Sequence, residues 1–378
     1  MFRIIKQVWQ IPIGSGLALL LVFLSSGCAN LLPTVPASGG RTRVIDESPR
    51  SAAIDSAPTP VLQRLRDEAT ALRPLAQSTL GQRFLDATRS LPPIAPRTAY
   101  INEMKREYFS VAEKSALPVS AQAKLAEVSL DEYRYYYTKY GSPLAYLRAL
   151  DLAAANGIAD VSGKRILDFG YGGIGQLRLL ASLGAYVTGI DPDSYLDALY
   201  SSARDQGPVP PAAGRRGHPG TIMLAHGFWP KDSSIVERVG RGYDLILSKN
   251  TLKKGYIKPE RKIDKRQQID LGVGDDVFLK AIHDTLNPGG KLIIYNLYPK
   301  PPDGKSAYNP QADARSPYTR EQYEKAGLQV VALNVEEHAI ARNIGRALKW
   351  DRNDKDEIIS DLETNHFAMY TLVARPLH

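Results

Sequence analysis

The sequence predicts an α/β fold, in which a doubly wound mixed sheet carries helices on both faces and follows a helical N-terminal region. Short β-branched runs alternate with helical segments from Lys164 to the C-terminus, and this alternation is typical of a doubly wound sheet. A glycine-rich turn joins the first of these strands to its helix. The chain has 378 residues, 43% of them hydrophobic, which is enough for a large core.

The composition excludes several classes of protein. Lys and Arg total 48 against 40 Asp and Glu, so the net charge is +8 and the surface is mildly basic. Such a surface suits anionic ligands or membranes, but no basic block carries interleaved aromatic residues, so we expect no nucleic acid partner. Cys28 is the one cysteine and the six histidines are scattered, so we expect neither a disulfide framework nor a metal site.

The first residues have the layout of a secretory signal. Arg3 and Lys6 precede an apolar run, 17–24, which is shorter than the ~20 residues that a membrane span needs. Small residues at 25–27 then precede Cys28, and this pattern resembles a bacterial lipoprotein signal. The resemblance implies a lipid on Cys28 and a membrane-associated, periplasm-facing protein. There are three alternatives: an ordinary signal peptide, a weak anchor, or a cytoplasmic enzyme whose signal does not work.

The composition divides the chain into four segments. Residues 1–27 are the expected signal peptide, and 28–60 are rich in Pro, Ser, Ala and Gly without hydrophobic periodicity, which predicts a disordered tether. Apolar residues at helical spacing predict a helical region over 61–157, and 158–378 form the α/β domain. The tyrosines that crowd the helical region could form one wall of a binding site or an amphipathic packing surface.

A strand, a turn and a helix follow one another at the start of the α/β domain. The strand RILDF, 165–169, leads directly into GYGGIG, where Gly170, Gly172 and Gly175 make a GxGxxG turn before a helix. A second strand ends at Asp191, about 20 residues further on. Glycines allow a ligand to approach the backbone, and a carboxylate can accept hydrogen bonds from both ribose hydroxyls. A nucleoside site is therefore favoured over a simple packing turn.

Further motifs point to a family. The segments DFGYGGIG and GIDPD resemble motif I and its acidic follower in the class I S-adenosylmethionine-dependent methyltransferases. Four later segments resemble further parts of that family, in the same order. Residues 242–252 resemble its fourth strand, and 278–297 resemble its helix, PGG turn and fifth strand. Residues 318–335 and 366–376 together resemble its last helix and closing strand pair. The resemblance runs from Lys164 to the C-terminus. It implies a Rossmann-like sheet and S-adenosyl-L-methionine as the cofactor.

The same resemblance implies a set of cofactor-binding residues. Asp168, two positions before the first glycine, could hold the ammonium group of the methionine moiety. Phe228, after the third strand, could stack on the adenine or fill the core. Ser248 stands at the end of the fourth strand. The expected set is Asp168, Gly170, Gly172, Gly175, Asp191, Phe228 and Ser248.

The chain departs from the family pattern at three places. Gly173 makes the glycine loop one residue longer than usual, and His226 and Gly227 stand where an acidic residue commonly contacts the adenine amine. After the fourth strand, Ser-Lys-Asn replaces the Asn-Pro-Pro signature of related amino-methylating enzymes, which argues against DNA or protein glutamine as the acceptor. Methyl transfer needs a base only if the nucleophile must lose a proton, and the weak candidates are His226, Tyr256 and Tyr140.

A basic insertion follows the fourth strand. Residues 249–266 contain eight basic side chains against Glu260 and Asp264, a local excess of six positive charges. Because loops after strand ends border the ligand crevice of such a sheet, this insertion could be a lid over an anionic small-molecule or lipid acceptor. The alternative is an ordinary solvated loop.

These observations leave two hypotheses of function. The first is an S-adenosylmethionine-dependent methyltransferase whose acceptor could be anionic. The alternative is an exported, lipid-tethered, non-catalytic binding module built on the methyltransferase fold. The alternative arises because the predicted signal would export the chain, whereas the cofactor is made in the cytosol.

Overall fold

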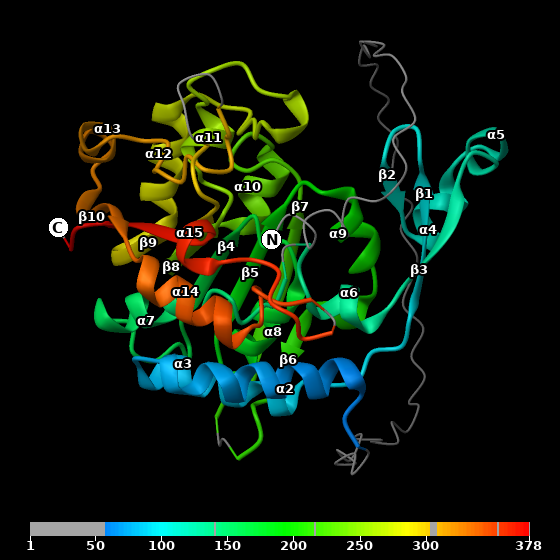
Figure 1. Cartoon of the computed structure of the whole chain (residues 1–378). Helices are drawn as coiled ribbons and strands as arrows, with labels where there is room; N and C mark the ends of the chain where they lie inside the picture. The colour runs from blue at the N-terminus through cyan, green and yellow to red at the C-terminus, as the bar shows by residue number, and fades with distance from the viewer. Residues whose placement is uncertain (1–56, 140, 215–216, 303–307, 354, 378) are drawn as a thin grey trace, which may run out of the picture.

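The structure, a computed structural model, describes residues 57–378 except 140, 215–216, 303–307, 354 and 378 (Figure 1). The predicted signal peptide 1–27, Cys28, most of the tether and Tyr140 therefore lie outside the described residues. Among the described residues, no helix combines the length and apolar character needed to cross a membrane.

An eight-stranded mixed sheet forms the centre of the fold, with the strand order β10-β11-β9-β8-β4-β5-β7-β6. Its parallel strands are β4 (Arg165–Phe169), β5 (Tyr186–Asp191), β7 (Gly220–His226), β8 (Tyr243–Lys249) and β9 (Leu286–Tyr298). The strands β11 (Phe367–Ala374) and β10 (Gln329–Glu336) form an antiparallel pair beside β9, and the short β6 (Gly207–Val209) lies antiparallel to β7. The predicted fold class is confirmed, including its closing strand pair.

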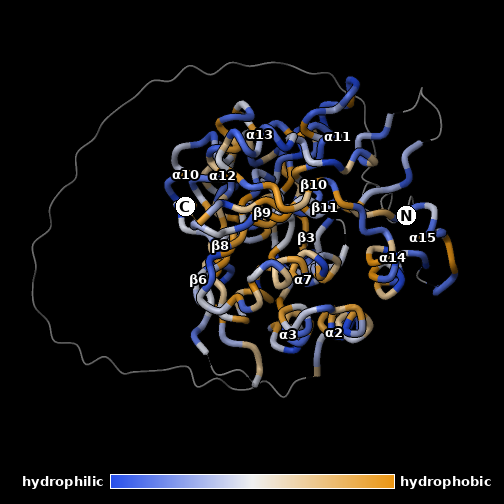
Figure 2. Tube along the Cα trace, turned by 90° about the vertical axis from the view of Figure 1, so that its left-hand side faces the viewer, coloured by the Kyte–Doolittle hydropathy of each residue, from blue (hydrophilic) through white to orange (hydrophobic). Residues whose placement is uncertain are grey.

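Helices cover both faces of the sheet, as Figure 2 shows. One face carries α7 (Leu147–Ala155), α8 (Ile174–Ser182), α9 (Ser194–Leu199) and α14 (His338–Ala347). The other carries α10 (Ser233–Val239), α12 (Asp275–Thr285) and α13 (Arg320–Lys325). The alternation of side chains along β4 divides the core accordingly, because Ile166 belongs to the first cluster and Leu167 to the second.

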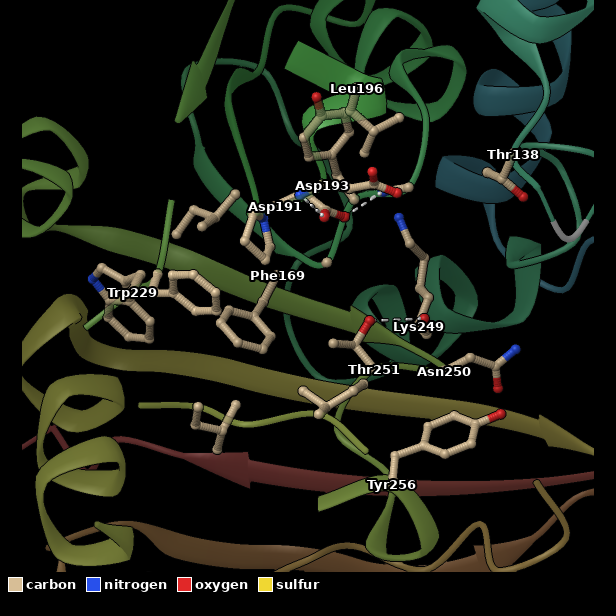
Figure 3. A pocket seen from close by; sticks show the side chains of 18 of the residues that line it. Thr138, Phe169, Asp191, Asp193, Leu196, Trp229, Lys249, Asn250, Thr251 and Tyr256 are labelled. Atoms are coloured by element: carbon tan, nitrogen blue, oxygen red, sulfur yellow. Dashed lines mark hydrogen bonds between the residues drawn. The ribbon is translucent and has the colours of Figure 1, made fainter. Parts of the chain in front are cut away.

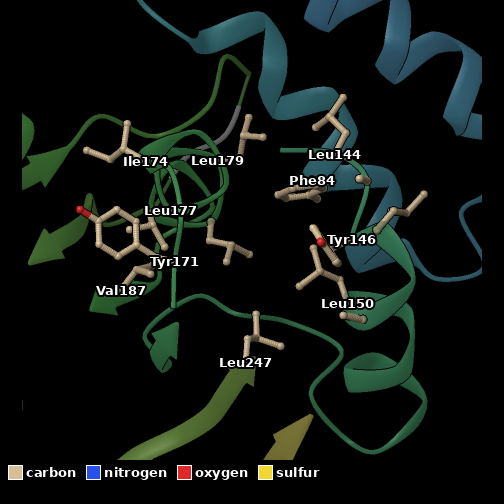
Figure 4. Close-up of a cluster of buried hydrophobic side chains, with 14 of the residues drawn as sticks. Phe84, Leu144, Tyr146, Leu150, Tyr171, Ile174, Leu177, Leu179, Val187 and Leu247 are labelled. Carbon is tan, nitrogen blue, oxygen red and sulfur yellow. The ribbon is translucent and has the colours of Figure 1, made fainter. Parts of the chain in front are cut away.

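The first helices of the described residues add a layer outside α7 and α8. Helix α2 (Pro60–Leu72) begins with Thr59 as its N-cap and Pro60 in its first turn, one residue before the predicted position 61. Helix α3 (Thr79–Asp86) packs against α7. Phe84 and Leu150 join the same buried cluster as Ile174 and Leu177 of α8 (Figure 4). The N-terminal region and the sheet therefore share one core.

The helical prediction for 61–157 is wrong in its middle part. This part forms a three-stranded antiparallel sheet of β1 (Arg97–Asn102), β2 (Glu107–Phe109) and β3 (Ala126–Leu130), which projects at the right of Figure 1. The helices beside it are short: α4 (Val111–Ala116), α5 (Val119–Gln122) and α6 (Glu132–Tyr136). The reversal between β1 and β2 explains the error, because Asn102 Oδ1 accepts the Lys105 N–H at 3.2 Å and Arg106 is left-handed (φ 58°).

Candidate functional site

A cavity of about 280 Å³ opens at the carboxyl ends of the parallel strands, where doubly wound sheets bind ligands. Its walls come from the glycine loop after β4, the end of β5, the loop after β7 and the segment after β8. Figure 3 shows Asp191 and Tyr256 on opposite sides of this space. The cavity brings together five of the predicted residues: Gly170, Gly172, Asp191, Phe228 and Tyr256.

The glycine loop comes close to neighbouring side chains. Gly170 and Gly172 have positive φ angles of 72° and 63°, which non-glycine residues adopt at a cost. A Cβ atom on Gly170 would lie 2.1 Å from Thr251 Oγ1, whereas one on Gly172 would have no neighbour closer than 3.9 Å. Gly170 is thus required by packing, and Gly172 keeps the cavity side of the loop open.

Gly175 has a different role from the one expected. It lies in α8 outside the cavity, and a Cβ atom there would meet the Tyr136 carbonyl oxygen at 2.3 Å. The third glycine of the motif therefore allows α8 to pack closely against the N-terminal region.

Asp191 ends β5 with its carboxylate held from two sides. Gly172 N–H donates to Oδ2 at 3.3 Å and Asp193 N–H donates to Oδ1 at 3.1 Å. Desolvation raises the pKa of Asp191 to about 6, against the lowering effect of these backbone donors. The carboxylate is oriented toward the cavity and retains lone pairs for further donors.

Asp168 does not face the cavity as expected. Its carboxylate is fully buried and forms an ion pair with the Lys249 ammonium from the end of β8. Lys249 also donates to Gln176 Oε1 at 2.6 Å, and it is Lys249 that lines the cavity. The chain's own cation thus occupies the place where a ligand ammonium was expected.

Phe228 and Ser248 differ in their exposure. The Phe228 ring is 44% exposed at the cavity and has the Lys231 ammonium 5.5 Å from its centroid, so it does not fill the core. Its neighbour Trp229 is buried and packs edge-on against Phe169. Ser248 is fully buried outside the cavity, and its hydroxyl accepts the Leu252 N–H at 3.0 Å. The expected cofactor contact of Ser248 has no support in this geometry.

Of the candidate bases, Tyr256 is the one that lines the cavity among the described residues. His226 lies outside it, with Nε2 3.6 Å from Asp197 Oδ1, and burial lowers its pKa. Tyr140 is not among the described residues. His226 is therefore poorly placed for proton transfer to a ligand in the cavity.

The sequence analysis missed residues that come from the N-terminal region. Thr138, Lys139 and Tyr146 line the cavity, and Lys139 forms an ion pair with Asp193 across its rim. Asn250 donates from Nδ2 to the Tyr146 hydroxyl at 2.7 Å. The density of tyrosines was the available signal. It has a mixed outcome, since Tyr146 lines the cavity whereas the buried Tyr135, Tyr136 and Tyr137 pack in the core.

The basic insertion 249–266 has a smaller excess of positive charge in the folded structure than its own sequence indicates. At least five of its basic side chains have partners, some of them acidic residues elsewhere in the chain. Lys249 pairs with Asp168 and Lys258 with Asp275, while Lys254 and Arg266 pair with Glu260 and Asp264 inside the segment. The fifth is Lys253, which is buried and donates to the carbonyl oxygens of Leu297 at 2.8 Å and Gln311 at 3.2 Å.

Lys253 is the most unusual of these side chains. Desolvation lowers its pKa to about 7, and its position under α11 (Lys254–Ile257) holds this segment against the end of β9. The insertion does border the cavity, because Asn250, Thr251 and Tyr256 line it. Of its six excess positive charges, however, two are offset by Asp168 and Asp275, which lie outside the segment.

No family model and no curated protein matches the chain. Three solved structures illustrate what its fold is similar to. The [4+2]-cyclase SpnF has 15% identity and a TM-score of 0.36, over 62% of this chain and 82% of that one. Precorrin-6y C5,15-methyltransferase from Geobacter metallireducens has 11% identity and a TM-score of 0.33, over 65% and 97%. Phosphoethanolamine N-methyltransferase 2 from Haemonchus contortus, in complex with phosphomonomethylethanolamine and S-adenosylhomocysteine, has 16% identity and a TM-score of 0.32, over 61% and 52%. Because these TM-scores are all below 0.5, we argue the function from the cavity itself.

Proposed function

We propose that the chain is a methyltransferase that binds S-adenosylmethionine in this cavity and transfers its methyl group to an acceptor bound beside it. One observation supports this above all others. A glycine turn at the end of β4 and a carboxylate at the end of β5 face the same cavity, and the turn's Gly172 N–H orients Asp191. This is the arrangement that binds a nucleoside at the carboxyl ends of parallel strands.

The residues present fit such a ligand. Two of the lone-pair positions of Asp191 are used by backbone N–H groups, which leaves others for the two ribose hydroxyls. Phe228 offers an exposed ring on which adenine can stack. Gly170 and Gly172 let the ligand approach the backbone closely.

The chain's part in the reaction is alignment. When bound, the sulfonium supplies a methyl group that is already activated for transfer. Asp191 and Phe228 would fix the nucleoside, and Thr138 and Lys139 would shield the cavity from water. Tyr256, on the opposite side from Asp191, is the hydroxyl placed to take part in proton transfer from an acceptor.

Two exposed lysines of the basic insertion bear on the acceptor. The exposed Lys262 and Lys265 support an anionic small molecule or a lipid headgroup as the acceptor. Nothing in the charge pattern of the chain suggests nucleic acid as a partner.

Calorimetry with the purified full-length chain tests the proposal. We expect S-adenosylmethionine and S-adenosylhomocysteine to bind at one site per chain, and adenosine to bind more weakly. Incubation with methyl-labelled S-adenosylmethionine and anionic acceptors should then give a labelled product. If neither nucleoside thioether binds, the proposal is wrong, whereas binding without transfer to any acceptor would favour the non-catalytic module.

We also propose that a lipid on Cys28 tethers the protein to a membrane on its periplasmic side. The short apolar run and the small residues before Cys28 support this, and the predicted tether 28–60 would separate the lipid from the folded part. Replacing Cys28 with Ser should abolish acylation and block removal of the signal. Intact mass of the membrane-extracted protein measures both, and a wild-type chain that begins at Met1 in the cytosol would contradict the tether.

A further inference from the structure

A buried polar cluster lies beneath the glycine loop. Asp168 of β4 and Lys249 of β8 point to the same side of the sheet, because β4 and β8 are parallel neighbours in which Asp168 stands beside Leu247, two residues before Lys249. Gln176 of α8 closes the cluster from above. All three side chains are buried, with exposures of 0% for Asp168, 2% for Gln176 and 8% for Lys249.

The three residues of the cluster differ in whether they line the cavity. Lys249 lines the cavity, but Asp168 and Gln176 do not. The ammonium of Lys249 donates to Asp168 Oδ2 and to Gln176 Oε1, which uses two of its three N–H donors. Oδ1 of Asp168 and Nε2 of Gln176 have no hydrogen-bond partner, and both are buried behind the lysine.

This geometry places a lysine, and not the expected aspartate, at one end of the cavity. A ligand ammonium directed at Asp168 would meet the Lys249 cation first, and like charges at close range in a buried site repel strongly. A carboxylate would instead meet a cation that is held in place by two acceptors and still has a donor to give. The end of the cavity below the glycine loop therefore presents a lysine N–H donor to a ligand and not a free carboxylate.

We propose that Lys249 is a specificity-determining residue that holds an S-adenosyl ligand by the carboxylate of its amino-acid tail and not by the ammonium. The inference rests on the proposed function, because it names the group of the same ligand that the buried end of the site recognises. Asp168 acts through Lys249: it positions the ammonium and offsets the cost of burying a charge.

A ligand series with the unmodified full-length chain tests this. The probes are S-adenosylhomocysteine, its analogue without the carboxylate, its analogue without the amino group, and 5′-methylthioadenosine, which lacks both. Loss of the carboxylate should weaken binding roughly 10- to 100-fold, as for a hydrogen bond between charged groups, and loss of the amino group should change it less than about threefold. The opposite order would overturn the inference, because Lys249 would then have to move aside to let the ammonium reach Asp168.

A variant of the lysine provides a second test. Replacing Lys249 with Gln removes the cation that meets the ligand carboxylate, so the analogue without the carboxylate should bind this variant nearly as well as S-adenosylhomocysteine does. Replacing Lys254 with Gln is the matched control, since this lysine of the same segment pairs with Glu260 and does not line the cavity. An unchanged order of preference in the folded Lys249 variant contradicts the inference. If none of the four probes binds the unmodified chain, the proposed function fails and the inference fails with it.

Discussion

The pKa of Asp191 predicts how ligand binding depends on pH. Desolvation raises this pKa to about 6, and the carboxylate accepts hydrogen bonds from ribose hydroxyls most strongly when it is ionised. Affinity should therefore rise with pH through about 6. If only the ionised form binds, the apparent affinity at pH 5 is roughly tenfold below its plateau, while at pH 7.5 it has nearly reached the plateau.

Calorimetric titration of S-adenosylhomocysteine at pH 5, 6, 7 and 8 measures this profile. Replacing Asp191 with Asn keeps the size of the side chain but removes the titrating group, so the variant should bind weakly with a nearly flat profile. Asp197 is a suitable control position, because its carboxylate lies in α9 and does not line the cavity. A flat profile for the unmodified chain between pH 5 and 7 would refute the reasoning about Asp191.

The same pKa has the opposite effect on stability. Because the folded state raises the pKa of an acid above its ordinary value of 3.8, it binds the proton more tightly than the unfolded state does. The stabilisation is complete below about pH 4 and is lost as the pH rises through about 6. At about 1.4 kcal/mol for each unit of pKa, the loss is about 3 kcal/mol at most. The ionised carboxylate that favours ligand binding thus lowers the stability of the protein without the ligand.

Two further predictions concern the packing around the cavity. Replacing Gly170 with Ala should lower the free energy of unfolding by more than replacing Gly172 does: both substitutions incur the ~1–2 kcal/mol of a left-handed residue, but the Cβ at Gly170 also lies 2.1 Å from Thr251 Oγ1. Equal losses in urea denaturation would contradict this. Replacing Asp205 with Ala should cost about 1.5–3 kcal/mol, because it removes the charged acceptor of a partly buried arginine and a buried tyrosine. Replacing the exposed Asp160 with Ala should lower the free energy of unfolding by at most about 1 kcal/mol in the same assay. Similar losses at Asp205 and Asp160 would contradict this prediction.

Much of the cavity could be predicted because its signals are local in sequence. The strand 165–169, the glycines that follow it and the acidic end of the next strand lie within about 30 residues. Each of these features is set by the conformation of a single turn or strand end. Gly170, Gly172 and Asp191 therefore line the cavity as the spacing indicates.

The partners of charged residues could not be predicted, because they come together only in the folded chain. Lys249 and Asp168 are 81 positions apart, and the pairing depends on β8 lying next to β4 in the sheet. Counting charges along 249–266 overstated the local positive charge for the same reason: the count includes Lys258 but not the partner that Asp275 provides from α12. Local composition describes an ionic surface poorly when its counter-ions come from other elements.

The glycine motif divides its work between a ligand and the N-terminal region. Gly170 and Gly172 shape the cavity, whereas Gly175 lets α8 approach the Tyr136 carbonyl oxygen of the segment that runs on to Thr138 and Lys139. Tyr136 is fully buried, so this contact limits how closely α8 and the segment leading to Thr138 and Lys139 can pack. A larger residue at 175 would displace this segment, although position 175 does not line the cavity. The N-terminal region is therefore a structural part of the binding site, which explains why it shares a core with the sheet.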